Sequence, residues 1–107
     1  MKARVHERKR FVAGRESIDR VVALCDADLL GKVFEQGDLC LDLSKSRSFY
    51  DGEKVSEQQA IELLKTPGAN LNLVGEKSLG AARKALRINE AAVKKISGVP
   101  VLQIYRL

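Results

Sequence analysis

The first part of the chain alternates polar and apolar positions as β-strands do. From Lys2 to Phe11, basic residues recur at every second position and apolar residues occupy several of the positions between them. A period of two predicts an extended strand with one basic face. Residues 14–17 predict a turn, and the Val-rich run of residues 20–25 predicts a short buried strand.

Residues 26–43 also predict short strands joined by turns. Asp26 and Asp28 end the strand, and residues 29–31 predict a brief helical turn. The dipeptide Gly37-Asp38 predicts a turn between residues 33–34 and the alternating run of residues 39–43, which predicts another strand. The front half of the chain is therefore expected to form hairpins.

The second half changes to a helical period. Ser56 begins the clearest helix, with Gln59 placed to complete a capping box, and residues 66–68 (Thr-Pro-Gly) end it. Residues 71–74 predict a short strand, and residues 77–86 predict a second helix. Residues 93–96 fit either a helical turn or a strand, and residues 99–107 predict a closing strand.

The elements together predict an α/β fold of the α+β kind: a single compact domain over residues 1–107, with a mixed β-sheet and about two packed helices. A strand–helix–strand crossover is expected in the later part of the chain. Trp is absent, so aliphatic residues must build the core. No apolar run has the length of a signal peptide or a membrane helix, which predicts a cytoplasmic protein with no membrane partner.

The inventory of reactive residues is small. The cysteines, Cys25 and Cys40, lack the close spacing of a zinc or redox motif, and His6 is the single histidine. These residues fall one short of the four protein ligands that a structural zinc site normally needs. We expect two buried, reduced thiols, although the sequence leaves a disulfide between them open. No catalytic constellation is complete, so we expect no catalytic residues, no metal and no cofactor, and the question of enzymatic activity leans towards no.

Charge is distributed unevenly along the chain. Residues 1–20 carry a balance of +4, residues 21–75 a balance of −4 and residues 76–107 a balance of +5. Basic ends favour an anionic partner, and phosphate backbones are the commonest one. We therefore expect a non-catalytic binding module that contacts RNA or a ribonucleoprotein, although a lysine- and arginine-rich edge strand that merely discourages aggregation is the alternative. The predicted nucleic-acid-binding residues are Arg4, His6, Arg8, Lys9, Arg10, Arg83, Lys84 and Arg87.

Two further features offer other functions. Gly75, Lys77 and Ser78 follow a strand and open a helix, so their backbone N–H groups favour an anion site for a small-ligand-binding protein or enzyme; a plain turn into the helix is the alternative. Phe49 and Tyr50 lie beside a turn. They predict either an anchor for a protein–protein interaction or two rings packed beneath the sheet.

Four segments resemble one known family. They are CDADLLGKVFEQGDLCLDL, FYDGEKVSEQQAIELL, NLVGEKS and ISGVPVLQIY, and they cover most of residues 20–107. In this order they are similar to an archaeal family known only as domain of unknown function 424. The resemblance implies an archaeal cytosolic protein with a compact α/β fold, and it implies no activity.

The chain departs from that family at its last segment. Members often carry His-Ala-Gln after the proline, where this chain has Val101-Leu102-Gln103. Any role of that histidine is therefore not transferred to this chain. The sequence does not indicate the oligomeric state.

Overall fold

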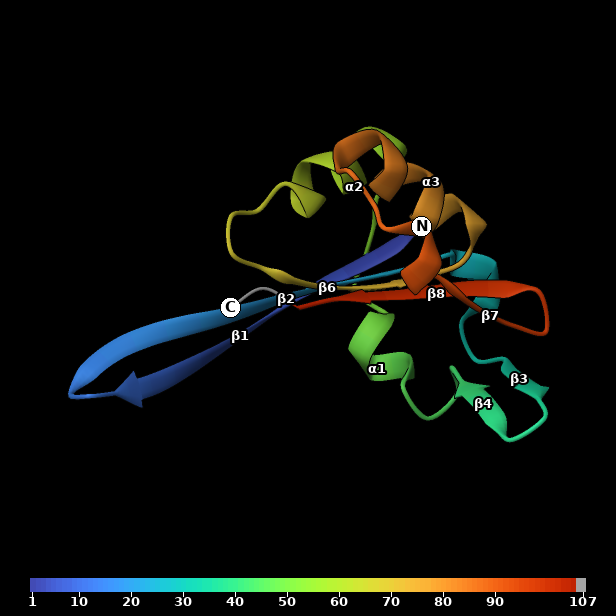
Figure 1. Cartoon of the computed structure of the whole chain (residues 1–107), viewed down its shortest axis with the longest axis horizontal. Helices are drawn as coiled ribbons and strands as arrows, with labels where there is room; N and C mark the ends of the chain where they lie inside the picture. The colour runs from blue at the N-terminus through green and yellow to red at the C-terminus, as the bar shows by residue number, and fades with distance from the viewer. Residues whose placement is uncertain (106–107) are drawn as a thin grey trace.

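The computed structural model describes residues 1–105, and its centre is a six-stranded mixed sheet (Figure 1). Across the sheet the strands follow the order β5-β1-β2-β6-β8-β7. Their bounds are β1 Lys2–Val12, β2 Arg15–Cys25, β5 Glu53–Lys54, β6 Asn70–Val74, β7 Lys94–Ile96 and β8 Val99–Ile104. The α+β architecture expected from the sequence is thus confirmed.

Two layers cover the sheet on opposite sides (Figure 1). Helices α2 (Glu57–Leu64) and α3 (Glu76–Ala85) pack on one face, which we call the helix side. The short helix α1 (Arg47–Tyr50) and the separate hairpin of β3 (Val33–Gln36) and β4 (Leu39–Asp42) lie on the other face, which we call the α1 side. Short 3₁₀ turns at Ala27–Leu29 and Glu90–Ala92 complete the chain.

Each face of the sheet has its own buried core, because side chains alternate along a strand. In β2, Val22 and Leu24 point into the cluster beneath α2 and α3. Their neighbours Ala23 and Cys25 point the other way, into a cluster that includes Tyr50 of α1. The central strands are therefore buried on both faces, which explains the continuous apolar run that the sequence shows there.

The strand–helix–strand crossover predicted late in the chain is confirmed. Helix α3 lies between β6 and β7, and both of these strands pair antiparallel with β8, so they run parallel to each other. Strand β8 lies between them in the sheet. Strands β2 and β6 are parallel hydrogen-bonded neighbours, and the long segment between them contains β3, β4, α1, β5 and α2.

The first hairpin is longer than the sequence suggested. The predicted turn at residues 14–17 is a two-residue turn at Ala13 and Gly14, both with positive φ (52° and 77°), and β2 already begins at Arg15. Positive φ at both central positions is the geometry that matches the twist of a tight hairpin. The strand predicted for residues 20–25 therefore starts five residues earlier.

The two cysteines have different environments, so the expectation that both are buried is wrong for one of them. Cys25 is fully buried and Cys40 is exposed, and both are free thiols. Along β4 and the residue that follows it, the alternation turns Leu41 and Leu43 towards the core and Cys40 away from it. Burial raises the pKa of the Cys25 thiol to about 12.

The second half of the chain largely has the elements expected from the sequence. The capping box is confirmed: the Ser56 hydroxyl accepts from the Gln59 N–H, and the Gln59 side chain accepts from the Ser56 N–H. The undecided residues 93–96 contain strand β7. The predicted closing strand ends at Ile104, and residues 106–107 of that prediction lie outside the described residues. Within the described chain, no helix has the length and apolar character needed to cross a membrane.

Candidate nucleic-acid interface

The most conspicuous feature of the molecule is a β-hairpin that extends beyond the sheet (Figure 1). We call residues 4–20 of β1 and β2 the arm. Among the described residues, neighbouring strands pair with β1 only at Lys2 and Ala3 on its outer side, and with β2 only from Val21 onwards. Within this part of the chain the arm therefore projects with both of its outer edges free, and it accounts for the elongated shape of 44 × 29 × 28 Å.

The arm has two faces of different charge. Residues directly opposite in an antiparallel pair share a face, so the register of β1 and β2 assigns each side chain to one face. The face on the α1 side, which we call the basic face, holds four arginines and one carboxylate and carries a balance of +3. Its charged members are Arg4, Arg8, Arg10, Arg15 and Asp19.

The opposite face of the arm, on the helix side, is electrically balanced. It holds Glu7, Lys9, Glu16 and Arg20, whose charges cancel, and we call it the neutral face. All four groups are paired within the face: Lys9 Nζ lies 3.6 Å from Glu16 Oε1, and Arg20 Nε lies 3.4 Å from Glu7 Oε1. The whole excess positive charge of the arm therefore belongs to the basic face.

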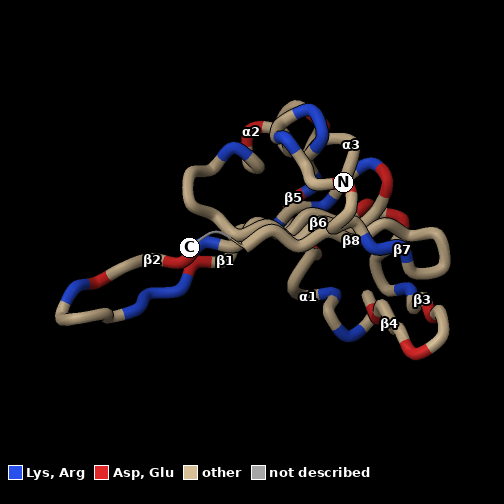
Figure 2. Tube along the Cα trace, in the orientation of Figure 1, with Lys and Arg blue, Asp and Glu red and all other residues tan. Residues whose placement is uncertain are grey.

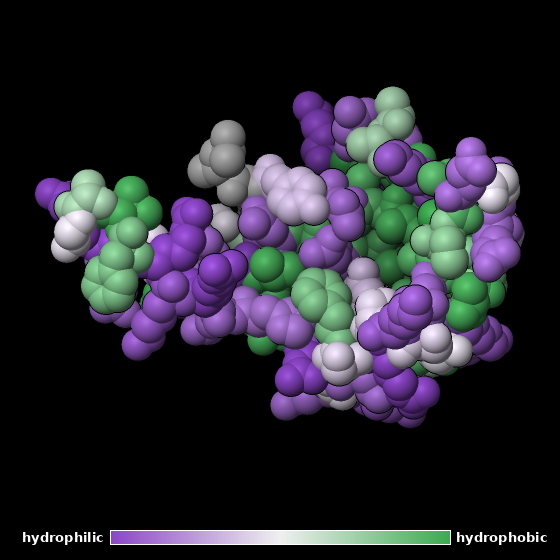
Figure 3. All heavy atoms as spheres, turned by 90° about the horizontal axis from the view of Figure 1, so that it is seen from below, coloured by the Kyte–Doolittle hydropathy of each residue, from purple (hydrophilic) through white to green (hydrophobic). Residues whose placement is uncertain are grey.

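Two arginines of the basic face are available to a ligand. Arg10 is paired with Asp19 across the strands, at 2.7 Å. Arg8 and Arg15 are exposed and form no ion pair with any described residue. Figure 2 shows the basic positions along the arm, and Figure 3, seen from the α1 side, shows a hydrophilic surface on the arm that ends in apolar side chains at its tip.

Helix α1 fixes the root of the basic face. Arg4 Nη1 donates to the Ser48 carbonyl oxygen at 2.8 Å, and His6 Nε2 donates to the Phe49 carbonyl oxygen at 2.9 Å. The imidazole of His6 also stacks on the Phe49 ring, with the centroids 4.4 Å apart and the planes 10° from parallel. His6 is thus a positioning residue that is half-buried at the base of the arm.

The two aromatic residues that the sequence indicated, Phe49 and Tyr50, make their ring contacts within the chain. Phe49 packs edge-on against Tyr50, at 5.1 Å, in addition to its stack on His6. Tyr50 is only 8% exposed, and burial raises its pKa to about 12. Of the two alternatives left open by the sequence, the structure has these rings packed beneath the sheet.

The basic residues of α3 do not extend the basic face. Arg83 makes a bidentate ion pair with Glu90: Nη2 donates to Oε1 at 2.9 Å and Nε donates to Oε2 at 3.2 Å. This pair raises the pKa of Arg83 and lowers that of Glu90. Lys84 pairs with Glu57, and Arg87, which follows the end of the helix, is exposed. This helix lies on the helix side of the sheet, so the predicted nucleic-acid-binding residues are divided between two sides of the molecule.

The predicted set therefore separates into parts. The structure brings together Arg4, His6, Arg8 and Arg10, whereas Lys9 lies on the neutral face. Sequence reasoning missed Arg15, because it was assigned to a turn. The signal was available: Ala13-Gly14 is a possible two-residue turn, and such a turn places Arg15 opposite Val12 on the basic face.

The predicted anion site at the start of α3 already binds a carboxylate of the same chain. Asp26, which is 6% exposed, accepts from the Lys77 N–H at 3.0 Å, and from the N–H and hydroxyl of Ser78, both at 2.8 Å. Gly75 has a φ of 106°, and a Cβ there would lie 2.3 Å from Asp26 Cγ. An external anion would have to displace this carboxylate from the helix N-terminus.

The acidic side chains of the described residues do not gather into a metal site. Among residues 1–105, no group of three His, Cys, Asp or Glu side chains is arranged to hold a metal ion. Asp42 is an example of a carboxylate with a local role. Its side chain accepts from the N–H groups of Ser44 and Lys45, both at 3.0 Å, and from the Ser44 hydroxyl, and these bonds lower its pKa.

Comparison with known proteins agrees with the resemblance noted in the sequence. No curated protein matches the chain. A solved structure from Methanopyrus kandleri, titled "Crystal structure of an uncharacterized conserved protein from Methanopyrus kandleri", has the same fold with a TM-score of 0.67 at 24% identity, over 96% of this chain and 91% of that one. The family described as "Protein of unknown function (DUF424)" matches residues 16–107, and the chain belongs to this family.

Proposed function

We propose that this protein is a non-catalytic, cytoplasmic RNA-binding module whose arm contacts the phosphate backbone of RNA or of a ribonucleoprotein. The observation that supports the proposal is the separation of charge on the arm: +3 on the basic face and zero on the neutral face. A solvated edge strand needs charge only to prevent aggregation and has no need for such a separation. A phosphate ligand requires positive charge gathered on one side.

The chemistry of the basic face favours phosphate contacts. Its cations are all arginines, and a guanidinium can bind a phosphate through two parallel hydrogen bonds. Side chains two residues apart on one strand are separated by roughly 6.6 Å, so Arg8 and Arg10 can contact separate backbone groups. The Phe49 ring, which lies at the root of the face, is already stacked on His6. Base stacking is therefore not the expected mode of contact.

Two double substitutions test this proposal with equal changes of net charge. Arg8→Ala with Arg15→Ala removes two cations from the basic face, and Lys9→Ala with Arg20→Ala removes two from the neutral face. Fluorescence anisotropy with a labelled RNA hairpin, measured over a range of salt concentrations, gives the affinity and its salt dependence.

Each lost phosphate contact is expected to reduce the slope of log K against log salt by about 0.7 to 0.9. The first variant should therefore lose about 1.4 to 1.8 of the slope, and the second should keep it. Equal losses in both variants would mean that only net charge matters and would contradict the assignment to the basic face. A DNA hairpin of the same sequence in competition tests the preference for RNA.

A further inference from the structure

The outer edge of the arm is an unpaired strand edge. Strand β5 pairs with β1 only at Lys2 and Ala3, so β1 has no neighbour on this side from Arg4 to Val12 among the described residues. The Met1 carbonyl oxygen accepts from the Val55 N–H, which shows that the odd-numbered residues of β1 direct their backbone groups outwards. On the free edge these residues are Val5, Glu7, Lys9 and Phe11.

The same odd-numbered residues direct their side chains to the helix side, where the arm has an unusual apolar surface. Val5 is 42% exposed, Ile18 is 45% exposed and Phe11 is 76% exposed. This surface leads to a groove of about 420 Å³ between α2 and the edge of the sheet, lined in part by Val55 and Leu63. An adjoining hollow extends the groove along β1 to Val5.

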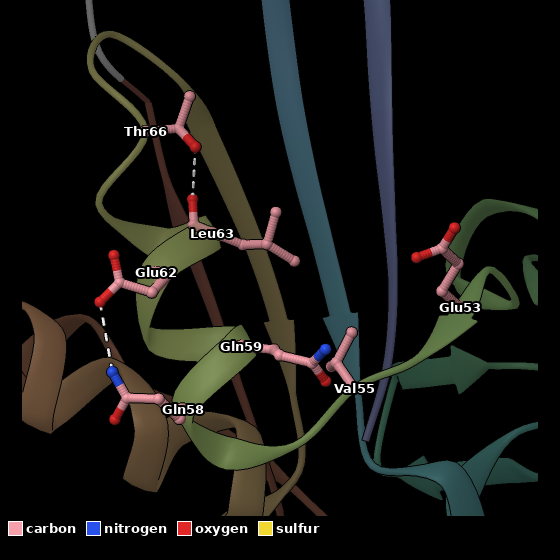
Figure 4. A pocket seen from close by; sticks show the side chains of 7 residues that line it. All are labelled: Glu53, Val55, Gln58, Gln59, Glu62, Leu63 and Thr66. Carbon is pink, nitrogen blue, oxygen red and sulfur yellow. Dashed lines mark hydrogen bonds between the residues drawn. The ribbon is translucent and has the colours of Figure 1, made fainter.

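Figure 4 shows this groove from close by. Leu63 points from α2 towards the strands, and Val55 lies on the chain that connects β5 to α2. Glu53, Glu62 and the two glutamines of α2 form its polar rim. The groove therefore offers an apolar floor beside an open strand edge, which is the arrangement that accepts an added strand.

We propose that the occupant is the arm of a second copy of this chain, with the two β1 strands paired antiparallel about a two-fold axis at Arg8. Antiparallel pairing of identical strands requires a self-complementary sequence, because each contact occurs twice. With the axis at Arg8, Glu7 lies opposite Lys9 of the second copy and Val5 lies opposite Phe11 of the second copy. Both pairs match in chemistry, and Phe11 then lies beside the groove that begins at Val5.

Neighbouring registers match less well. A shift of two residues in one direction places Glu7 opposite Glu7 of the second copy, and a shift in the other direction places Lys9 opposite Lys9. Like charges directly opposite each other destabilise a strand pair. The chosen register also fits the length of the edge, because Arg4 then meets Val12 of the second copy, at the point where β5 ends the free edge.

One contact in this arrangement is unfavourable. Arg8 lies opposite Arg8 of the second copy on the basic face, and the two cations repel each other. Residues directly opposite each other in an antiparallel pair share a face. The basic faces of the two arms therefore lie on the same side of the paired strands and form one surface. The proposed pairing is independent of the proposed function, and Arg8 distinguishes them: Arg8→Ala should strengthen self-association, whereas it should weaken RNA binding.

Sedimentation equilibrium of the ribonuclease-treated protein measures the association directly. The apparent mass should rise with concentration from 11.8 kDa towards twice that value. Glu7→Lys opposes like charges at two symmetric positions and should raise the dissociation constant by roughly tenfold. Glu16→Lys is the matched control, since it makes the same charge change on the neutral face away from the free edge. A monomer at every soluble concentration, or equal effects of the two substitutions, would overturn the proposal.

Disulfide formation tests the register. In a Cys40→Ser background, which removes the exposed native thiol, Arg8→Cys should give a cross-linked dimer under mild oxidation because the two cysteines meet at the axis. Arg10→Cys should remain unlinked, because it lies opposite His6 of the second copy. Equal cross-linking by both variants would contradict this register.

Discussion

Asp26 provides the most informative test of the fold, because one side chain joins two segments that are far apart in sequence. Its carboxylate closes the N-terminus of α3, 52 residues away from Ser78. Replacing Asp26 by Asn keeps the shape of the side chain and removes its charge. The effect therefore reports on the hydrogen bonds and on the helix dipole, with little contribution from packing.

The expected loss of stability follows from the contacts. One carboxylate oxygen, Oδ1, accepts from both the N–H and the hydroxyl of Ser78, so the amide oxygen of the Asn takes this position. The amide nitrogen then faces the Lys77 N–H, which loses its acceptor. One charge-assisted hydrogen bond contributes about 1.5 to 3 kcal/mol and a negative charge at a helix N-terminus about 0.3 to 1 kcal/mol. Together they predict a loss of about 2 to 4 kcal/mol.

Urea unfolding monitored by circular dichroism measures this loss. With an m value of about 1 to 3 kcal/mol/M, the midpoint should fall by about 0.7 to 4 M while the slope stays constant. Asp28→Asn is the matched control, because Asp28 is exposed and its change is expected to stay within about 0.5 kcal/mol. If Asp26→Asn also stays within that limit, the carboxylate does not stabilise the start of α3, and the reasoning is refuted.

Three further outcomes can be measured on the same protein. Gly75→Ala should lower the free energy of unfolding in urea by about 2 to 4 kcal/mol, because the new Cβ would clash with the Asp26 carboxylate and the backbone φ is 106°. Gly98→Ala is the control: its φ is 81° but the space around it is open, so the loss should be about 1 kcal/mol. A thiol reagent should modify Cys40 rapidly in the folded protein and Cys25 only on unfolding, so rapid modification of both thiols would contradict the burial of the second. An NMR titration should give Asp42 a pKa below the ordinary value of 3.8, because its hydrogen bonds favour the charged carboxylate. The stability that these bonds contribute is complete above pH 3.8 and is lost as the pH falls through the lowered pKa. A measured pKa above 3.8 would contradict the hydrogen bonds.

Local patterns in the sequence were sufficient for most of the secondary structure. The capping box at Ser56 and the alternation along β1 are properties of neighbouring residues, and both are confirmed. The position of β8 between β6 and β7 and the exposure of Cys40 depend on which elements pack together. That information is carried by contacts between distant residues, which periodicity does not record.

The same distinction explains the candidate sites. The helix start at Gly75 has the local features of an anion site, yet the anion comes from Asp26, far away in the sequence. Likewise, Arg83 and Lys84 contribute to the basic end of the sequence, but each is paired with a glutamate of another segment. Charge counted along a chain overestimates the charge available at a surface, because such pairs form only on folding.

The arm shows why one strand can serve two kinds of contact. In β1 the period of two governs side chains and backbone groups together. Even-numbered residues such as Arg8 bond to β2 through their backbone and present their side chains on the basic face. Odd-numbered residues such as Glu7 and Phe11 direct their backbone to the free edge and their side chains to the helix side. A substitution at an even position should therefore alter phosphate binding, and at Arg8, on the proposed axis, it should alter strand pairing as well. A substitution at an odd position should alter strand pairing without changing the basic face.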